Sequence, residues 1–187
     1  ELGGSRMHYN FPRIGGVKRD LPYGFAQRAR AKLDLFKQRI QEYESLFDES
    51  TVFLVRTQGV GYTKAEEMMN HGVTGPNVRA AGVDYDVRWA HPYSVYSELD
   101  WAPAVERSSV KGADCYDRYR VRVTEMVESA NMVLEALDRI PGGSETHHEP
   151  GDPAIIAKAP SRAPEGTFGS HHFEDSRGES MFHIVGG

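Results

Sequence analysis

The chain has 187 residues, of which 39% are hydrophobic and 26% are charged, and its formal net charge is −5. No apolar run approaches the ~18 residues that a membrane-spanning helix needs, and the acidic balance argues against a dedicated nucleic-acid-binding protein. One cysteine, Cys115, excludes an internal disulfide framework and an iron–sulfur cluster held by four thiolates of this chain alone.

The two ends of the sequence predict a fragment. The first residue is Glu1 rather than an initiator methionine, and the last six, "FHIVGG", form an apolar, strand-like run. We therefore expect the chain to be part of a longer protein.

The stretch "MHYNFPRIGGVKRDLP", Met7 to Pro22, combines aromatic rings, basic side chains, a glycine pair and two prolines. Glycine frees the backbone and proline fixes it, so this composition predicts a shaped loop rather than a periodic element. Such a loop either has a functional role or forms a structural corner at the start of a helix.

Apolar residues recur at steps of three and four from Phe25 to Phe47, which predicts a long amphipathic helix. Pro22 suits a first helical turn, and Asp20 can cap the free amide groups. The opposite face is basic, and we interpret it as a solvated surface, with docking on an acidic partner as the alternative.

A second helix is predicted from Thr63 to His71. Thr63 and Glu66 have the spacing of a capping box, and Gly72 stands where a left-handed stop belongs. The preceding "VFLV" fits either a short strand or a hydrophobic lead-in. From Gly72 to Pro103 the sequence is irregular and rich in glycine, proline and aromatic residues, which marks this stretch as a recognition candidate.

A third helix follows Asp114, which can cap its start, and Pro141 to Gly143 are predicted to end it. Residues 141–166 form a proline- and glycine-rich linker or insertion. Thr167 to Val185 is expected to form two short strands around "EDSRG", with Gly178 available for the turn.

Two groups of histidines raise the question of a metal site, namely His147 with His148 in the linker, and His171, His172 and His183 near the hairpin, together with Glu174 and Asp175. Adjacent strand residues point to opposite faces, so we interpret these side chains as exposed histidines rather than ligands.

Cys115 near a helix start could be a nucleophile, but acids flank it, and a packed thiol is the better interpretation. Neither glycine-containing stretch has the spacing of a nucleotide-binding fingerprint. Four arginines lie in glycine-, proline- or aromatic-rich stretches: Arg13, Arg79, Arg88 and Arg118. We interpret them as residues that order loops and subunit contacts, with direct action on a substrate as the alternative.

Three blocks in order resemble one family. "GGSRMHYNFPRIGGVKRDLP", "GVTGPNVRAAGVDYDVRWAHPYSVY" and "DCYDRYRVRVTEMVES" are similar to motifs of the hydrogenase-like large subunit of respiratory complex I. The resemblance implies a mainly α (α+β) fold of the hydrogenase large-subunit type, with irregular central loops and a small C-terminal β-hairpin. The expected divisions are a helical core over residues 1–140, the linker at 141–166, and the start of a truncated hairpin segment at 167–187.

The resemblance also implies a function. The hydrogenase-like subunit of this proton-pumping NADH:quinone oxidoreductase of the respiratory chain lies against the iron–sulfur small subunit, and the quinone chamber forms between the two. NADH, FMN and the iron–sulfur clusters belong to partner subunits, this chain alone binds no cofactor or metal, and nucleic acid is not a partner. The implied location is the cytoplasmic side of the cell membrane, as a peripheral protein docked on the membrane arm.

The residues that the motifs place near the quinone chamber or a subunit interface fall into two groups. The first shapes the N-terminal loop: Arg13, Gly15, Gly16 and Asp20. The second holds the central loops together: Arg79, Asp86, Arg88, Asp114, Tyr116, Asp117 and Arg118.

Some positions depart from the family pattern, which suggests a divergent branch. Ala113 stands for a common glycine, Ala81 for serine, Glu165 for a basic residue and Thr167 for an acidic one. In the family, the His and Tyr that meet the quinone headgroup precede these blocks, so the fragment alone is not expected to catalyse a reaction.

Two other functions fit the same residues. One is the large subunit of a membrane-bound [NiFe] hydrogenase, whose cysteine pairs would lie outside this chain. The other is a non-catalytic subunit kept for its contacts. The electron donor could also be reduced ferredoxin or a deazaflavin rather than NADH.

Overall fold

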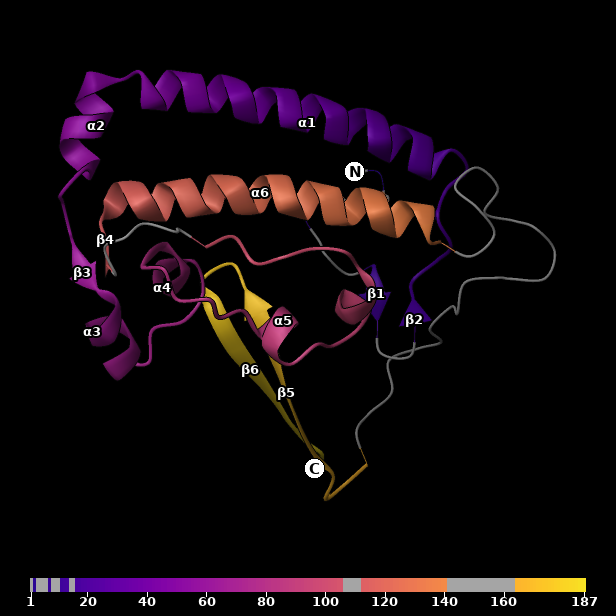
Figure 1. Cartoon of the computed structure of the whole chain (residues 1–187). Coiled ribbons are helices and arrows are strands. Elements are labelled where there is room, and N and C mark those ends of the chain that lie inside the picture. The colour runs from indigo at the N-terminus through magenta and orange to yellow at the C-terminus, as the bar shows by residue number, and fades with distance from the viewer. Residues whose placement is uncertain (1, 3–6, 8–10, 14–15, 106–111, 141–163) are drawn as a thin grey trace. The chain divides into compact units, whose positions relative to one another are not determined.

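The computed structural model describes residues 2, 7, 11–13, 16–105, 112–140 and 164–187. These residues belong to two compact units. The first comprises residues 1–36, 133–168 and 184–187, and the second comprises residues 37–132 and 169–183. The described part is mainly helical and ends in a β-hairpin, which confirms the predicted fold class (Figure 1).

In the first unit, the beginning of helix α1 (Phe25–Asp48) packs on the end of helix α6 (Cys115–Asp138). Ala26 and Ala29 are buried with Leu137 in a small apolar core, as expected for one face of an amphipathic helix. An ion pair of 2.5 Å joins Arg30 of the basic face to Asp138. The long predicted helix is therefore confirmed, and part of its basic face makes contacts within the chain.

The N-terminal loop contains a minimal antiparallel pair of strands, β1 (Pro12–Arg13) and β2 (Gly16–Val17). Pro12 stands opposite Val17, and the Lys18 N–H donates to the Phe11 carbonyl at 2.8 Å. Gly16 has φ +147°, a region that side chains disfavour. β1 and β2 are thus an antiparallel pair that precedes α1.

In the second unit, residues 37–48 of α1 lie beside the beginning of α6, joined by a hydrogen bond of 2.7 Å from Lys37 to Asn131. Helix α2 (Thr51–Thr57) follows, so the alternatives of a strand or a lead-in for "VFLV" were both wrong. Ser50 caps α2 by accepting from the Phe53 N–H. The Phe53 ring packs 5.1 Å from Tyr119 of α6, centroid to centroid, and this contact stabilises a helical turn over a short apolar run.

Strand β3 (Thr63–Lys64) pairs antiparallel with β4 (Gly112–Ala113), and helix α3 (Ala65–Asn70) comes directly after β3. The predicted capping role of Thr63 was wrong, because Thr63 is held in the strand opposite Ala113. The cap residue is Lys64, which makes no side-chain cap hydrogen bond. The stop at Gly72 is confirmed, with φ +68°.

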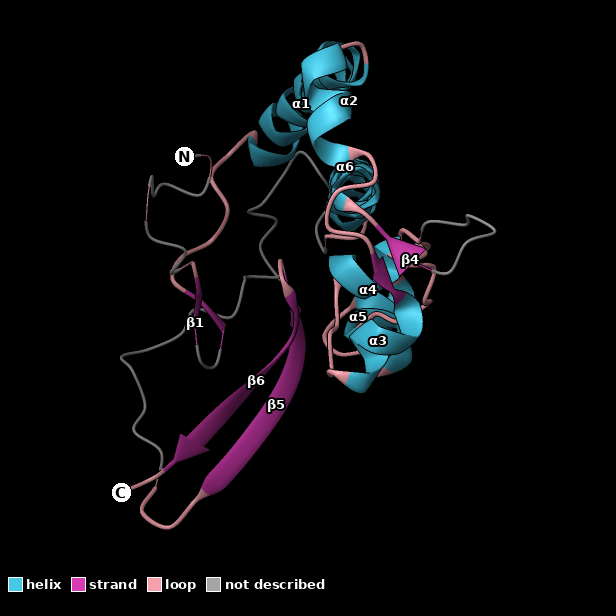
Figure 2. Ribbon diagram, turned by 90° about the vertical axis from the view of Figure 1, so that its left-hand side faces the viewer, coloured by secondary structure: helices cyan, strands magenta, loops and turns pink. Residues whose placement is uncertain are grey.

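The irregular stretch that follows contains short helices separated by turns (Figure 2). They are α4 (Pro76–Ala80), α5 (Val87–Ala90) and the 3-10 helix η1 (Tyr96–Glu98). Helix α4 packs on α3 and β4. A core cluster of this unit contains buried apolar residues of α3, α4, β4 and α6, among them Met68, Val78, Ala113 and Val121.

The predicted hairpin is confirmed as strands β5 (Phe168–Asp175) and β6 (Gly178–Val185). Its turn is at Ser176 and Arg177, and Gly178, which was predicted for the turn, is the first residue of β6. Helix α6 ends at Asp138, and the residues predicted to stop it, Pro141 to Gly143, lie outside the described residues, as does most of the 141–166 linker. Among the described helices, none is both long and apolar enough to cross a membrane.

Candidate functional site

Arg79 of α4 is the centre of a buried ion-pair network in the second unit. Its side chain is 1% exposed. Its Nε donates to Glu125 Oε1 at 2.8 Å, and its Nη2 also pairs with Glu125. Its Nη1 lies 2.8 Å from Glu174 Oε1 and 3.1 Å from Asp86 Oδ2. One guanidinium therefore joins α4 to the start of α5, to α6 and to β5.

Asp86 is fully buried and caps α5. It accepts three hydrogen bonds from Arg88: from the backbone N–H and Nε at 2.9 Å, and from Nη2 at 2.6 Å. Burial opposes the charge of Arg88, but the pair with Asp86 outweighs it and raises the pKa of Arg88. The Arg88 guanidinium also lies over the ring of Trp101, 4.8 Å from its centroid, which fixes the chain after η1.

The hairpin is attached to these loops by backbone and side-chain contacts. Gly75 and Gly178 touch, since a Cβ built on Gly75 would overlap the Cα of Gly178. The Glu179 N–H donates to Thr74 Oγ1 at 2.9 Å, and Tyr85 donates to the Glu179 carboxylate at 2.8 Å. His172 Nδ1 lies 2.7 Å from the same carboxylate, and both partners lower the pKa of Glu179.

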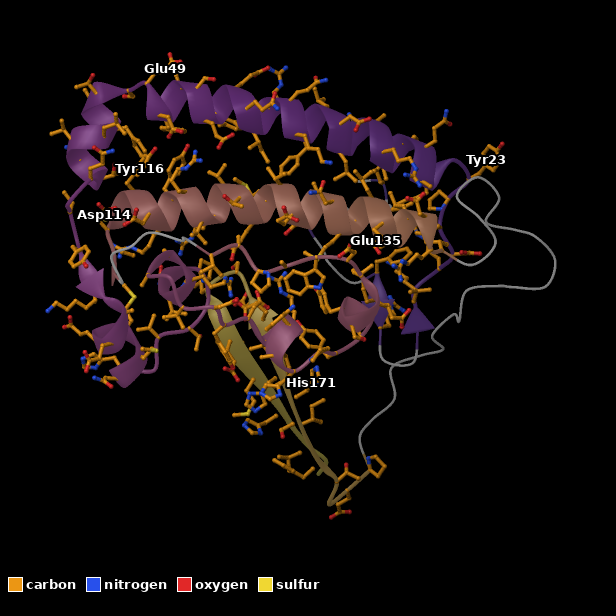
Figure 3. All side chains as sticks on the ribbon, viewed as in Figure 1. Tyr23, Glu49, Asp114, Tyr116, Glu135 and His171 are labelled. Carbon is orange, nitrogen blue, oxygen red and sulfur yellow. The ribbon has the colours of Figure 1, made fainter. Side chains whose placement is uncertain are left out.

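A cavity of about 420 Å³ lies between the loop after α5 and the hairpin. Aromatic and polar side chains line it, and His171 stands edge-on to Tyr93 with ring centroids 5.2 Å apart. Figure 3 shows His171 on the hairpin. No group of three or more His, Cys, Asp or Glu residues suited to a metal ion occurs among the described residues. His147 and His148 lie outside the described residues.

A second site forms where α6 begins. Asp114 accepts from the Asp117 N–H at 3.0 Å, and Asp117 accepts from the Asp114 N–H at 2.9 Å, which is a reciprocal cap. Asp114 also accepts from the Gly59 N–H at 2.7 Å. Burial opposes ionisation of Asp114, yet the backbone donors outweigh it and lower its pKa. The predicted cap is confirmed.

Arg118 joins this cap to the segment before β3. It donates to the Ala113 carbonyl at 3.1 Å and to the Gly61 carbonyl at 2.9 Å. Gly61 has φ +64°, and a Cβ there would lie 3.0 Å from the Arg118 guanidinium. The predicted role of this arginine in ordering a loop fits these contacts.

Tyr116 projects from the first turns of α6 towards the end of α1 (Figure 3). Its hydroxyl donates to Asp48 Oδ1 at 3.1 Å, and burial together with this carboxylate raises the pKa of Tyr116. Arg120 binds Glu44 and Asp48, both at 2.9 Å. The neighbouring Tyr119 hydroxyl is buried and has no hydrogen-bond partner among the described residues.

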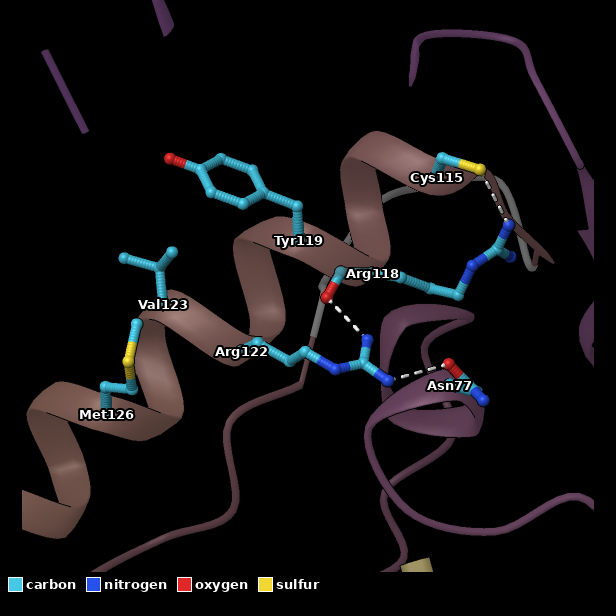
Figure 4. A pocket seen from close by; sticks show the side chains of 7 residues that line it. All are labelled: Asn77, Cys115, Arg118, Tyr119, Arg122, Val123 and Met126. Carbon is cyan, nitrogen blue, oxygen red and sulfur yellow. Dashed lines mark hydrogen bonds between the residues drawn. The ribbon is translucent and has the colours of Figure 1, made fainter. Parts of the chain in front are cut away.

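Cys115 lines a second cavity of about 420 Å³ on α6 (Figure 4). Arg118 Nη2 lies 3.4 Å from the Sγ atom, and Arg122 donates to Asn77 of α4 at 3.2 Å. The thiol is half-buried, as expected for a packed cysteine.

The N-terminal candidates belong to the first unit. Arg13 stands opposite Gly16 in the β1–β2 pair and is exposed. Asp20 is half-buried and accepts from the Leu21 N–H at 2.8 Å. Gly15 lies outside the described residues. The structure thus brings Arg79, Asp86 and Arg88 together, places the α6 group at a separate site in the same unit, and leaves the N-terminal group in the other unit.

Sequence reasoning missed one acid of the network, Glu125, and considered the other, Glu174, only beside the hairpin histidines of a possible metal site. Glu125 stands inside the third quoted block, where the motif itself could have indicated it. Glu174 lies in the histidine-rich hairpin, and no local pattern distinguishes it from Glu179 or Asp175. Only the fold places Glu174 next to Arg79.

Comparison with known proteins shows the family of the chain. The family model described as "Respiratory-chain NADH dehydrogenase, 49 Kd subunit" matches residues 1–187. The chain belongs to this family. The resemblance identified from the three motifs is therefore confirmed.

Individual relatives agree, and each is named as a subunit of a quinone oxidoreductase. The NADH-quinone oxidoreductase subunit of Rhizobium etli (strain CIAT 652) is 44% identical over 142 residues, which are 76% of this chain and 34% of the relative. The corresponding protein of Flavobacterium johnsoniae is 44% identical over 153 residues, 80% of this chain and 35% of the relative. A chloroplastic NAD(P)H-quinone oxidoreductase subunit of Zygnema circumcarinatum is 45% identical over 140 residues, 75% of this chain and 35% of the relative. The chain spans about a third of the length of these relatives.

Proposed function

We propose that this chain is part of the quinone-site subunit of a proton-pumping NADH:quinone oxidoreductase. The observation that supports this proposal is the family match over residues 1–187, together with relatives named as subunits of NADH-quinone oxidoreductases. In this proposal the chain helps to form a quinone chamber against an iron–sulfur subunit. NADH, FMN and the iron–sulfur clusters are bound by partner subunits, and the assembly is peripheral, on the cytoplasmic side of the membrane.

The geometry suggests different roles for the candidate residues. Arg79 and Asp86 are buried and have their charges paired within the chain, so they fit a scaffold that holds the central loops. Asp114 and Arg118 fit the same role at the start of α6. Arg13 is exposed on a tight strand pair, where its guanidinium can reach a neighbouring subunit or the chamber.

The N-terminal role can be tested in the purified complex with Arg13→Ala. We expect quinone reduction by NADH to fall by about tenfold or more, while NADH oxidation by an artificial acceptor that bypasses quinone stays unchanged. Lys32→Ala is the matched control, because Lys32 is an exposed cation on α1 outside the candidate residues. Equal quinone reduction in the Arg13 and Lys32 variants would contradict the assignment of Arg13.

The proposed function itself has a stricter test. A complex assembled without this subunit should lose inhibitor-sensitive quinone reduction but keep NADH oxidation by the artificial acceptor. Inhibitor-sensitive quinone reduction that survives the loss of the subunit would refute the proposal.

A further inference from the structure

The ion-pair network around Arg79 contains more acidic than basic groups. Arg79 and Arg88 contribute two positive charges, whereas Asp86, Glu125 and Glu174 contribute three carboxyl groups. Full ionisation would leave one uncompensated negative charge in a place where the Arg79 side chain is 1% exposed and the Asp86 side chain 0%. An unpaired charge in such surroundings is costly, and neutralisation by a proton is the usual outcome.

The contacts indicate which carboxyl group takes the proton. Asp86 accepts three hydrogen bonds from Arg88, two of them from the guanidinium. Glu125 has two donors from Arg79, and its side chain is 20% exposed, so water also reaches it. Asp86 and Glu125 therefore each accept two hydrogen bonds from a guanidinium, whereas Glu174 accepts one.

Glu174 is compensated least. Its side chain is 4% exposed. Its Oε1 shares the Nη1 of Arg79 with Asp86 and the Tyr85 carbonyl. Among the described residues, its Oε2 receives one hydrogen bond, a long one of 3.4 Å from the Val87 N–H. Oε2 is thus the oxygen at which a proton would be held.

We propose that Glu174 is a proton-binding site, which holds a proton beside Arg79 and exchanges it through the cavity between the α5 loop and the hairpin. Val87 and Tyr93 line this cavity, and both contact Glu174: Val87 through the bond to Oε2, and Tyr93 by accepting from the Glu174 N–H at 3.1 Å. His171, His172 and Glu179 line the same cavity, and the two histidines are exposed. Titratable groups that contact water therefore line a cavity whose wall residues Val87 and Tyr93 contact Glu174.

The surroundings of Glu174 support the assignment. Burial raises its pKa, and the neighbouring Asp86 acts in the same direction, while Arg79 and the Val87 N–H act against it. The charged and titratable groups that face it come from α4, from the start of α5 and the loops beside α5, and, through Arg79, from α6. They are Arg79, Asp86, Arg88, Tyr85, Tyr93 and Glu125. This inference does not rest on the proposed function, since it concerns binding of a proton rather than turnover.

The test is a pH titration of the purified complex by infrared difference spectroscopy. We expect a carbonyl band of a protonated carboxylic acid at pH values above about 5.5, where exposed glutamates are ionised. The band should shift in D2O, disappear in Glu174→Gln, and remain in Glu98→Gln, the matched control at an exposed glutamate in η1. Absence of the band in the wild-type complex, or an unchanged band in Glu174→Gln, would overturn the proposal.

A second variant keeps the proposal testable if Glu174→Gln fails to assemble. Glu125→Gln removes a competitor for Arg79, so the ionised form of Glu174 should gain stabilisation. The midpoint of the band should move down by about one pH unit, a tenfold loss of proton affinity. An unmoved midpoint would contradict the assignment of the band to this network. Because the spectra require no turnover, loss of quinone reduction would count against the proposed function and not against the proton site.

Discussion

Gly75 and Gly178, more than a hundred positions apart in the sequence, touch backbone to backbone. The Gly75 N-cap of α4 has φ +73°, Gly178 at the start of β6 has φ +131°, and no room for a Cβ exists at either position. The contact joins the segment from Thr74 to Pro76 to the hairpin. It thereby places β5, which carries Glu174, beside Arg79.

We expect Gly178→Ala to destabilise the attachment of the hairpin by about 2 kcal/mol or more, from steric overlap with Thr74 and an unfavourable φ. The measurement is hydrogen–deuterium exchange of peptides covering residues 74–90 in the complex, where about 1.4 kcal/mol corresponds to tenfold faster exchange. Gly169→Ala in β5 is the control, because nothing lies within 4 Å of a Cβ there. Equal exchange in both variants would show that the glycine contact does not fix the hairpin.

Arg79→Met should be the most damaging single change in the network. It removes the cation shared by three carboxyl groups, and breaking buried pairs in this way costs about 3–5 kcal/mol. Thermal unfolding and the assembled fraction of the complex report the loss. Arg39→Met, which breaks an exposed pair with Glu42 on α1, should leave the unfolding temperature close to that of the wild type. A small loss of stability in Arg79→Met would mean that the three carboxyl groups become protonated when the Arg79 guanidinium is removed.

The cap at α6 should make stability depend on acid. The pKa of Asp114 is lowered in the folded chain, so its contribution is fully present above the pKa of an unfolded aspartate and is lost as the pH falls through the folded value. Asp114→Asn should lower the stability by about 1 kcal/mol at neutral pH. On acidification the variant should lose less additional stability than the wild type does. Local exchange of residues 59–64, corrected for its intrinsic pH dependence, measures the effect. Asp84→Asn, at an exposed loop position, should follow the wild-type profile.

Two neighbouring tyrosines offer a matched comparison. Tyr116→Phe removes the hydrogen bond to Asp48 and should destabilise the contact between α1 and α6 by about 1 kcal/mol. Tyr119→Phe removes a buried hydroxyl that has no partner among the described residues, so it should be neutral or stabilising. Protection of backbone amides from hydrogen–deuterium exchange at the start of α6 distinguishes the two variants. Equal destabilisation would indicate that the Tyr119 hydroxyl is bonded in the assembled complex.

The sequence by itself determined the long helices, the cap at Asp114, the stop at Gly72 and the hairpin, because each depends on periodicity or on a residue acting within its own turn. It also determined the family, because three ordered motifs identify the chain without coordinates. Local signals were wrong at two places where distant partners decide. Phe53 enters a helix that packs on Tyr119, and Thr63 enters a strand opposite Ala113.

Only the tertiary structure decided which charges meet. The sequence indicated that Arg79 and Asp86 order a loop, but the other partners of Arg79, Glu125 and Glu174, lie 46 and 95 positions from it. The proximity of Glu174 depends on the packing of a hairpin through two glycines, and no local pattern encodes such a contact. The physical reason is that burial and charge balance are properties of the assembled site, whereas helical period and capping are properties of a few adjacent residues.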